Sequence, residues 1–251
     1  MGKSISKYLK RSKEIIREEG IAAFIRKAYS ELRLILDMYV NRSLSHFYIK
    51  GFHKLYYYSA NTWQNTYWMG VPAQKCPLDL WIYAEVIYKT KPSFIIETGT
   101  ANGGSALFFA SICDLIGEGK VITIDISECD VSHSRITKIV GDSVSQEVIN
   151  QVKDIVGNKP AMVILDSDHH KNHVLKEMEL YSEFVPVGNY LVVEDTNING
   201  HPVLPGWGGK GGGPMEAVEE FIKCRQDFEI DKAREKFLLT FFPRGFLRRI
   251  K

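Results

Sequence analysis

Acidic side chains follow two apolar runs in the second half of the chain. The run Met162–Leu165 precedes Asp166, and the run Tyr190–Val193 precedes Glu194 and Asp195. If the runs are neighbouring parallel strands, these acids meet at one edge of the sheet and offer hard oxygen ligands to Mg²⁺ or another divalent cation. A cation held there lowers the pKa of a bound hydroxyl group and stabilises the alkoxide as it forms.

A histidine lies close to the first of these acids. His169 follows Asp166 by three residues and is the candidate general base, a role worth roughly 10²–10⁴ in rate when well placed. The alternative for a single histidine is a structural role. Asp168 is better suited to capping the helix that we expect to begin near Lys171. A histidine-rich iron or zinc site is a further alternative, but acids dominate the pattern.

A second chemical pattern is the glycine-rich turn after the apolar run Phe94–Ile96. Gly99, Gly103 and Gly104 allow the backbone to pass close to a ligand because no Cβ intrudes. Glu97 precedes the first glycine, where a dinucleotide site would need close approach to a pyrophosphate. A carboxylate at that position favours a cationic ligand, although a dinucleotide site and a turn without a ligand are alternatives.

Two further acids extend this pattern along the chain. Asp125 ends the next apolar run, where an acid can accept both hydroxyl groups of a ribose. Asp142 and Ser143 follow the third run, where an adenine edge would lie. Acids at the ends of successive strands predict a nucleoside site, and with Glu97 they favour S-adenosylmethionine over a dinucleotide.

Short apolar runs alternating with helical patterns predict an α/β fold with a doubly wound, mostly parallel sheet. The expected parallel strands are Phe94–Ile96, Val121–Ile124, Ile136–Val140, Met162–Leu165 and Tyr190–Val193. The expected helices are Pro77–Lys89, Gly103–Ile116, Lys171–Phe184 and Pro214–Cys224. Near the carboxyl terminus, Phe237–Phe242 and Phe246–Ile250 predict an antiparallel pair turning at residues 243–245.

The composition is that of an ordinary globular protein. The chain has 251 residues, of which 45% are hydrophobic and 25% charged, enough for one α/β domain with an appendage. The four cysteines are scattered, which favours reduced thiols in a cytoplasm. The amino-terminal stretch carries charges throughout and predicts neither a secretory signal nor a membrane span. We expect a helical extension at residues 1–66 and the main domain at 67–251.

The amino-terminal extension is basic. Six Lys and Arg side chains lie within residues 3–17 against a single acid, Glu14, although the whole chain has a net charge of only +2. The apolar residues fall on one helical face, so the segment can lie on an anionic membrane or can dock on the main domain with its lysines in water. The residues of this face are Ile5, Tyr8, Leu9, Ile15 and Ile16.

Two other features bear on partners. The basic carboxyl terminus, with Arg244, Arg248, Arg249 and Lys251, adds to the case for peripheral membrane contact, and the aromatic helices expected before residue 60 favour a homo-oligomer. The glycine-rich stretch Asn197–Pro214 leaves the fifth strand over the expected site. We interpret it as a lid that carries Trp207 and His201 toward an acceptor, with simple surface flexibility as the alternative.

The order of these motifs resembles one known family. From about Trp68 onward, the chain is similar to the cephalosporin hydroxylase and rhamnosyl O-methyltransferase family, a branch of the class I methyltransferases. The residues that carry the resemblance are FIIETGTANGGSALFFA, VITIDI, GDS, LDSDHH, YLVVEDTNINGHPV and GGGPMEAVEEF. The first sixty residues match no family motif.

The resemblance implies a Rossmann-like, seven-stranded methyltransferase sheet and a defined set of site residues. The implied contacts to S-adenosylmethionine are Glu97, Gly99, Thr100, Ala101, Gly103, Ser105, Asp125, Asp142, Ser143 and Asp166. It also implies a Mg²⁺ site at Asp166, Glu194 and Asp195. His169 matches the histidine base of related sugar methyltransferases, whereas catechol methyltransferases have a lysine there.

We therefore expect an O-methyltransferase that depends on S-adenosylmethionine and Mg²⁺. The expected acceptor is a hydroxyl group of a deoxyhexose or related sugar on a glycan, glycolipid or natural product, and no nucleic acid partner is expected. The alternatives are a non-catalytic accessory subunit of a hydroxylase and an oxidoreductase that uses NAD. The hydroxylase name itself does not follow, since the sequence lacks the two-histidine, one-carboxylate spacing of a non-haem iron oxygenase.

Overall fold

The computed structural model describes the backbone of residues 2–251 and the side chains from Lys10 onward. The side chains of Ile5, Tyr8 and Leu9, on which the predicted amphipathic face depends, lie outside the described residues. The chain divides into two compact units, Met1–Gly51 and Phe52–Lys251.

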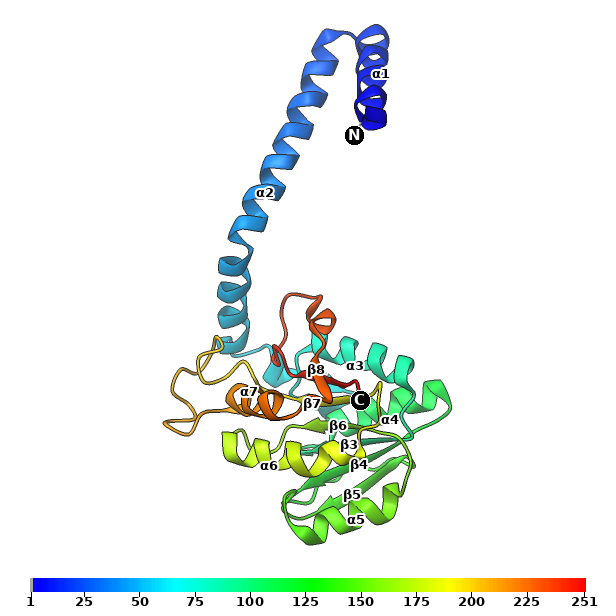
Figure 1. The fold of residues 1–251 in the computed structure, drawn as a ribbon, viewed down its shortest axis with the longest axis vertical. Coiled ribbons are helices and arrows are strands. Elements are labelled where there is room, and N and C mark those ends of the chain that lie inside the picture. The colour runs from blue at the N-terminus through cyan, green and yellow to red at the C-terminus, as the bar shows by residue number, and fades with distance from the viewer. Residues whose placement is uncertain (1) are drawn as a thin grey trace. The chain divides into compact units, whose positions relative to one another are not determined.

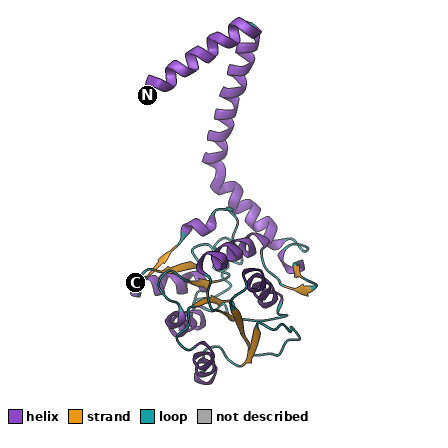
Figure 2. Cartoon of the chain, turned by 90° about the vertical axis from the view of Figure 1, so that its right-hand side faces the viewer, coloured by secondary structure: helices purple, strands orange, loops and turns teal. Residues whose placement is uncertain are grey.

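The amino-terminal unit contains α1 (Gly2–Glu19) and the larger part of α2 (Ile21–Tyr58), whose last turns belong to the second unit. Gly20 separates them with a φ of +88°, a backbone conformation that glycine adopts at little cost. Helix α2 is a single element of 38 residues, and Figure 2 shows its length. In the part of the chain that the structure describes, neither these helices nor any other is long and apolar enough to cross a membrane.

The second unit is organised around a seven-stranded sheet in the order β5-β4-β3-β6-β7-β9-β8 (Figure 1). The first five strands in this order run parallel and the last two are antiparallel to their neighbours. The predicted doubly wound, mostly parallel sheet is confirmed. The strands are β3 (Phe94–Thr98), β4 (Lys120–Asp125), β5 (Ile136–Val140), β6 (Ala161–Leu165), β7 (Tyr190–Val193), β8 (Phe228–Ile230) and β9 (Phe246–Arg249).

Helices cover both faces of this sheet. Apolar side chains of α3 (Pro77–Thr90) and α4 (Gly104–Ile116) pack against one face. The other face is covered by α5 (Gln146–Val156), α6 (Lys171–Tyr181) and α7 (Pro214–Cys224). Because both faces are buried, the central strands β3, β6 and β7 are buried along their whole length.

The predicted strand at Phe237–Phe242 is wrong. The edge strand that pairs with β9 is β8, and the segment before Pro243 is irregular. Residues 239–242 are buried, but they pair with no strand of the sheet and are held by tertiary contacts. The Phe241 ring instead contacts Tyr57 and Trp63, and its backbone N–H donates to an Asp79 carboxylate oxygen at 2.9 Å.

A short hairpin precedes α3 and leads the chain to the edge of the sheet. It consists of β1 (Tyr67–Trp68) and β2 (Val71–Pro72), and it follows a short 3₁₀ turn at Trp63–Asn65. Two further 3₁₀ turns lie at Ser182–Phe184 and Lys232–Glu235. The hairpin delivers the segment before Pro77 to the ends of β6 and β7, where the candidate site lies.

Candidate active site

The carboxyl ends of the parallel strands are level, so the predicted acids gather at one edge of the sheet. Thr98 of β3 pairs with both Ile124 and Leu165, the positions before the predicted acids of β4 and β6. Gly99 then turns with a φ of +86°, and a Cβ there would overlap the carbonyl oxygen of Asp166. Only glycine allows this close approach between the two loops.

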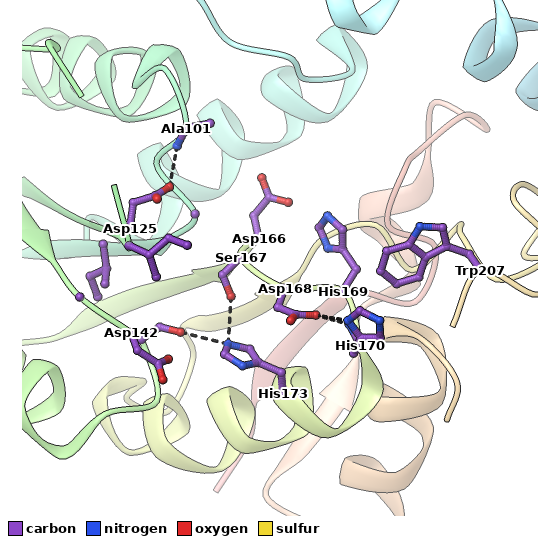
Figure 3. Close-up of a pocket in the computed structure, with 15 residues that line it drawn as sticks. Ala101, Asp125, Asp142, Asp166, Ser167, Asp168, His169, His170, His173 and Trp207 are labelled. Carbon is purple, nitrogen blue, oxygen red and sulfur yellow. Dashed lines mark hydrogen bonds and ion pairs between the residues drawn. The ribbon is translucent and has the colours of Figure 1, made fainter. Parts of the chain in front are cut away.

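A pocket of about 640 Å³ opens beside this turn (Figure 3). Asp125 lies in its wall, where one carboxylate oxygen accepts from the Ala101 N–H and the other from the Ser127 N–H, each at 2.9 Å. The predicted nucleoside residues Gly99, Ala101, Asp125, Asp142, Ser143 and Asp166 all line this pocket. Its size and its acids at strand ends fit a nucleoside.

Glu97 is fully buried behind the turn. The Thr123 hydroxyl donates to Oε2 at 2.8 Å, while Oε1 has no hydrogen-bond partner in the described structure. Burial raises the pKa of Glu97 to about 7, although Lys75 and the hydroxyls of Ser105 and Thr123 oppose the rise. A buried, unpaired carboxylate oxygen fits a cationic group of a ligand, such as the ammonium of S-adenosylmethionine.

The remaining predicted cofactor residues lie around this turn. Gly103 is the amino-terminal cap of α4, and Ser105 is buried in its first turn. The Thr100 hydroxyl shares a 2.6 Å hydrogen bond with Thr123. Thr100 and Ser105 line a second cavity of about 220 Å³, which also reaches Asp195.

Three potential metal ligands converge where the two cavities meet. Asp166, His169 and Asp195 each offer one ligand atom, and these atoms lie within 4.8 Å of one another. His169 Nε2 is 3.2 Å from an Asp195 carboxylate oxygen. Burial raises the pKa of Asp195, and His169 opposes this rise. Two carboxylates and an imidazole within this distance fit a divalent cation of the Mg²⁺ or Mn²⁺ type.

Glu194 makes different contacts from the other predicted metal ligands. Its two carboxylate oxygens accept from the Lys75 ammonium at 2.7 Å and from the Tyr83 hydroxyl at 2.8 Å. Lys75 also pairs with Asp166. Burial alone would lower the pKa of Lys75, but the two carboxylates raise it, so the side chain is an ammonium. We refer to Lys75, Tyr83, Asp166 and Glu194 as the lysine cluster.

A second polar group, the serine cluster, consists of Ser143, Ser167, His173 and Glu177. The two serine hydroxyls donate to Glu177 Oε1 at 2.6 and 2.7 Å, and His173 Nε2 lies 3.6 Å from it. The other oxygen of the buried Glu177 has no partner in the described structure. Figure 3 shows His173 directed toward Ser167 at the pocket wall.

The sequence interpretation included Ser143 but missed Lys75 and Glu177. Lys75 is 91 residues from Asp166 and 119 from Glu194, so no local pattern links them. Glu177 lies mid-helix in α6, where an acid ordinarily indicates an exposed position. The sequence held a signal only for Glu177: it falls on the same face of α6 as the apolar residues that pack on the sheet.

The glycine-rich loop brings an aromatic side chain to the pocket. The Trp207 ring lies 4.9 Å from the His170 ring and 5.8 Å from the His169 ring, between centroids. His201 instead bonds Glu216 of α7 at 2.8 Å. The prediction that Asp168 caps α6 is wrong: the N-cap position is His170, whose side chain makes no capping hydrogen bond, and Asp168 accepts from the His170 backbone N–H at 2.7 Å. Of the two residues predicted to be carried by a lid, Trp207 alone lines the pocket.

The sheet order, the nucleoside pocket and the acidic group at its edge define a class I, S-adenosylmethionine-dependent O-methyltransferase. Residues 60–250 match the family described as Rhamnosyl O-methyltransferase/CmcI, and the chain belongs to this family. The predicted class of enzyme is confirmed. Membership of this family does not favour the two alternatives, an NAD-dependent oxidoreductase and an accessory subunit.

Two relatives and one solved structure illustrate the similarity. The chain is 42% identical to the rhamnosyl O-methyltransferase of Mycobacterium leprae over 207 residues, which are 79% of this chain and 89% of that protein. It is 41% identical to that of Mycobacterium tuberculosis over 208 residues, covering 79% and 83% of the two chains. A CmcI structure with Mg and S-adenosylmethionine shares the fold, with 23% identity, a TM-score of 0.58, and coverage of 75% and 78%.

Proposed function

We propose that this protein transfers the methyl group of S-adenosylmethionine to a hydroxyl group of a rhamnosyl or related deoxyhexose unit, with a divalent cation bound at the acidic group. The observation that carries this proposal is the convergence of Asp166, His169 and Asp195 at the edge of the nucleoside pocket. The 41–42% identical relatives are named as rhamnosyl O-methyltransferases, which supports a rhamnosyl acceptor.

The residues of the pocket hold the methyl donor. Asp125 has carboxylate lone pairs free beyond the two backbone N–H groups that it accepts, and these suit ribose hydroxyls. Glu97 Oε1 suits the ammonium group of the donor. Bound there, S-adenosylmethionine supplies an electrophilic methyl group on its sulfonium. Holding donor and acceptor in one site removes much of the entropic cost of their encounter.

His169 removes the proton from the acceptor hydroxyl. Its Nε2 faces Asp195 at 3.2 Å, so the carboxylate orients the ring and stabilises the imidazolium that proton removal creates. A divalent cation at Asp166, Asp195 and Glu194 supplies Lewis acidity that lowers the pKa of the acceptor hydroxyl. Of these three carboxylates, Glu194 depends on a change in its Lys75 contact to act as a ligand.

A coupled assay tests this function. The purified protein is incubated with S-adenosylmethionine, Mg²⁺ and a synthetic rhamnoside, and the methylated sugar is detected by mass spectrometry. We expect product that disappears with a chelator and returns with added Mg²⁺. Parallel calorimetric titrations with S-adenosylmethionine and NAD should show binding of the first alone. Binding of NAD, or a product that forms equally with chelator, would contradict the proposal.

We further propose that the amino-terminal unit makes peripheral contact with an anionic membrane. Residues 1–51 contain eleven Lys and Arg against five Asp and Glu, a net charge of +6, whereas residues 52–251 contain 21 against 25, a net charge of −4. Helix α2 also exposes apolar side chains on all sides along its length. They include Ile21, Ile25, Tyr29, Leu32, Leu34, Ile35, Leu36, Met38, Tyr39, Val40, Leu44 and Phe47.

The basic carboxyl terminus offers less positive charge for membrane contact than the sequence suggests, because two of its arginines bind groups of the same domain. Arg244 pairs with Glu219 at 2.7 Å, and Arg249 donates to the Val185 carbonyl at 2.8 Å. Membrane contact therefore depends on the amino-terminal unit. Co-sedimentation with phosphatidylglycerol vesicles should exceed that with phosphatidylcholine vesicles. Replacing Lys10, Arg11, Lys13 and Arg17 by Gln should abolish the difference, and an unchanged difference would contradict the proposal.

Cytoplasmic location and a homo-oligomer remain predictions. The exposed apolar residues of α2 would also suit a second copy of the helix, which light scattering of the purified chain at low and high salt would detect. Association that persists without lipid would assign this surface to a second copy.

A further inference from the structure

Lys75 places a positive charge inside the acidic group at the edge of the sheet. The side chain is 5% exposed and pairs with Asp166 and, at 2.7 Å, with Glu194. The remaining oxygen of Glu194 accepts from the Tyr83 hydroxyl at 2.8 Å. Each carboxylate oxygen of Glu194 therefore accepts a hydrogen bond from one of this chain's own side chains.

Backbone contacts and the neighbouring elements on either side of it in the chain fix the position of Lys75. Its backbone N–H donates to the Thr66 hydroxyl at 3.0 Å, and its carbonyl accepts from the same hydroxyl at 3.1 Å. Gln74 before it has a φ of +51°, and α3 begins two residues after it. The ammonium is thus delivered by the segment between β2 and α3, independently of the strands that carry the acids.

We propose that Lys75 is a built-in counter-ion that sets the metal affinity of the site, an inference that rests on the proposed divalent cation. When all are ionised, Asp166, Glu194 and Asp195 carry three negative charges, and the ammonium reduces the net charge to two. Three carboxylates this close, with Glu194 buried and Asp166 and Asp195 half-buried, would repel one another. The ammonium allows the site to fold before a cation binds, and it also weakens cation binding by electrostatic repulsion.

The proposal predicts an unusual sign for a substitution at the site. Lys75→Met removes the charge and keeps the apolar length of the side chain. We expect Mg²⁺ to bind about tenfold or more tightly, because a nearby positive charge is lost. We also expect a lower melting temperature without Mg²⁺ and a larger rise on adding Mg²⁺ than in the wild type. Structural damage alone would weaken Mg²⁺ binding.

Matched variants separate charge from packing. Tyr83→Phe removes an uncharged hydrogen bond to the same carboxylate and should leave the Mg²⁺ Kd within about threefold. Lys75→Gln also removes the charge but can still donate a hydrogen bond to a carboxylate, so it should bind Mg²⁺ more tightly than the wild type as well. It also covers the case in which Lys75→Met alone does not fold.

Calorimetric titration of each full-length variant with MgCl₂ decides the matter, with no acceptor or methyl transfer needed. Tighter binding by Lys75→Met and by Lys75→Gln, with Tyr83→Phe close to the wild type, supports the proposal. Unchanged or weaker binding by the folded Lys75 variants would overturn it. If the wild type itself does not bind Mg²⁺, the proposed function fails, which is a separate result.

Discussion

Two buried glutamates near the segment Asp166–Ser167 are compensated in different ways. Glu194 in the lysine cluster faces an ammonium and a phenol hydroxyl. Glu177 in the serine cluster accepts two serine hydroxyls and has a histidine 3.6 Å away, with one oxygen unpaired. Both side chains are at most 4% exposed, so burial does not explain the difference.

The difference indicates what each side of the site is built to bind. A fixed ammonium balances charge where several carboxylates converge and where a second cation has to enter. Hydroxyl groups and a histidine serve where the wall of the nucleoside pocket faces an uncharged base and sugar. Under the proposed function, the lysine side would support the chemistry and the serine side would help to bind the methyl donor.

The largest expected effect contrasts the two histidines. His169→Ala should lower kcat by about 10²–10⁴ because the general base is lost. His173→Ala should lower kcat less than about tenfold and raise the KM for S-adenosylmethionine, because it disturbs the pocket wall. Steady-state kinetics separate these outcomes. If His169→Ala binds Mg²⁺ with an unchanged Kd, His169 is a base. If His169→Ala no longer binds Mg²⁺, His169 is a metal ligand.

The two glutamates should differ in stability when each is made neutral. Glu194→Gln leaves Lys75 with one carboxylate fewer and should lower the free energy of unfolding by about 2–3 kcal/mol. Glu177→Gln keeps an acceptor for the serine hydroxyls and should cost about 1 kcal/mol or less. Urea unfolding without metal measures both, and equal losses would remove the distinction between the clusters.

The neutral member of the lysine cluster should contribute less than the charged one. Tyr83→Phe leaves one buried oxygen of Glu194 without a donor, which should cost about 1–2 kcal/mol. The ring packs against Phe109 and Phe242, so phenylalanine preserves the apolar contacts. Thermal unfolding of Tyr83→Phe beside Glu194→Gln gives the ranking, and a larger loss for Tyr83→Phe would contradict it.

The smallest expected effect is a pH dependence from the serine cluster. The nearby Glu177 carboxylate raises the pKa of His173, although burial opposes the rise. This stabilisation is fully present below the unfolded pKa of about 6.5 and is lost as the pH rises through the folded pKa. Because the ring is partly exposed, we expect less than about 1 kcal/mol. Melting temperatures of wild type and His173→Gln should differ less at pH 9 than at pH 6.

His53 provides an internal control of opposite sign. Burial lowers its pKa to about 4, so its contribution to stability is present above about pH 6.5 and is lost as the pH falls toward 4. His53→Gln should therefore flatten the acid side of the profile and leave the difference between pH 6.5 and 9 unchanged. A change on the alkaline side would show that the assignment to His173 is wrong.

The sequence predicted what depends on local pattern and strand order. The five parallel strands follow from short apolar runs, and Asp125 and Asp142 follow because acids at strand ends share one edge of a parallel sheet. The Phe237–Phe242 segment was mistaken for a strand because aromatic residues favour strands, whereas tertiary packing against Trp63 decides its conformation.

Electrostatic contacts between residues far apart in the chain could not be predicted from the sequence. Nothing near Lys75 distinguishes it from a surface lysine, and its burial depends on acids that arrive from strands far along the chain. The contacts of Glu194 with Lys75 and Tyr83 could not be predicted for the same reason. The sequence thus located the acids at this edge but could not reveal that one of them faces a lysine.

The crowded crossing between Gly99 and Asp166 joins the donor pocket to the proposed metal site. The Gly99 turn lines the pocket, the Asp166 N–H donates to the Thr98 carbonyl at 3.0 Å, and no space for a Cβ separates the two loops. If binding of one ligand shifted its loop, the other loop would have to respond. Donor and metal binding would then be thermodynamically linked, and each ligand would change the affinity for the other by the same factor.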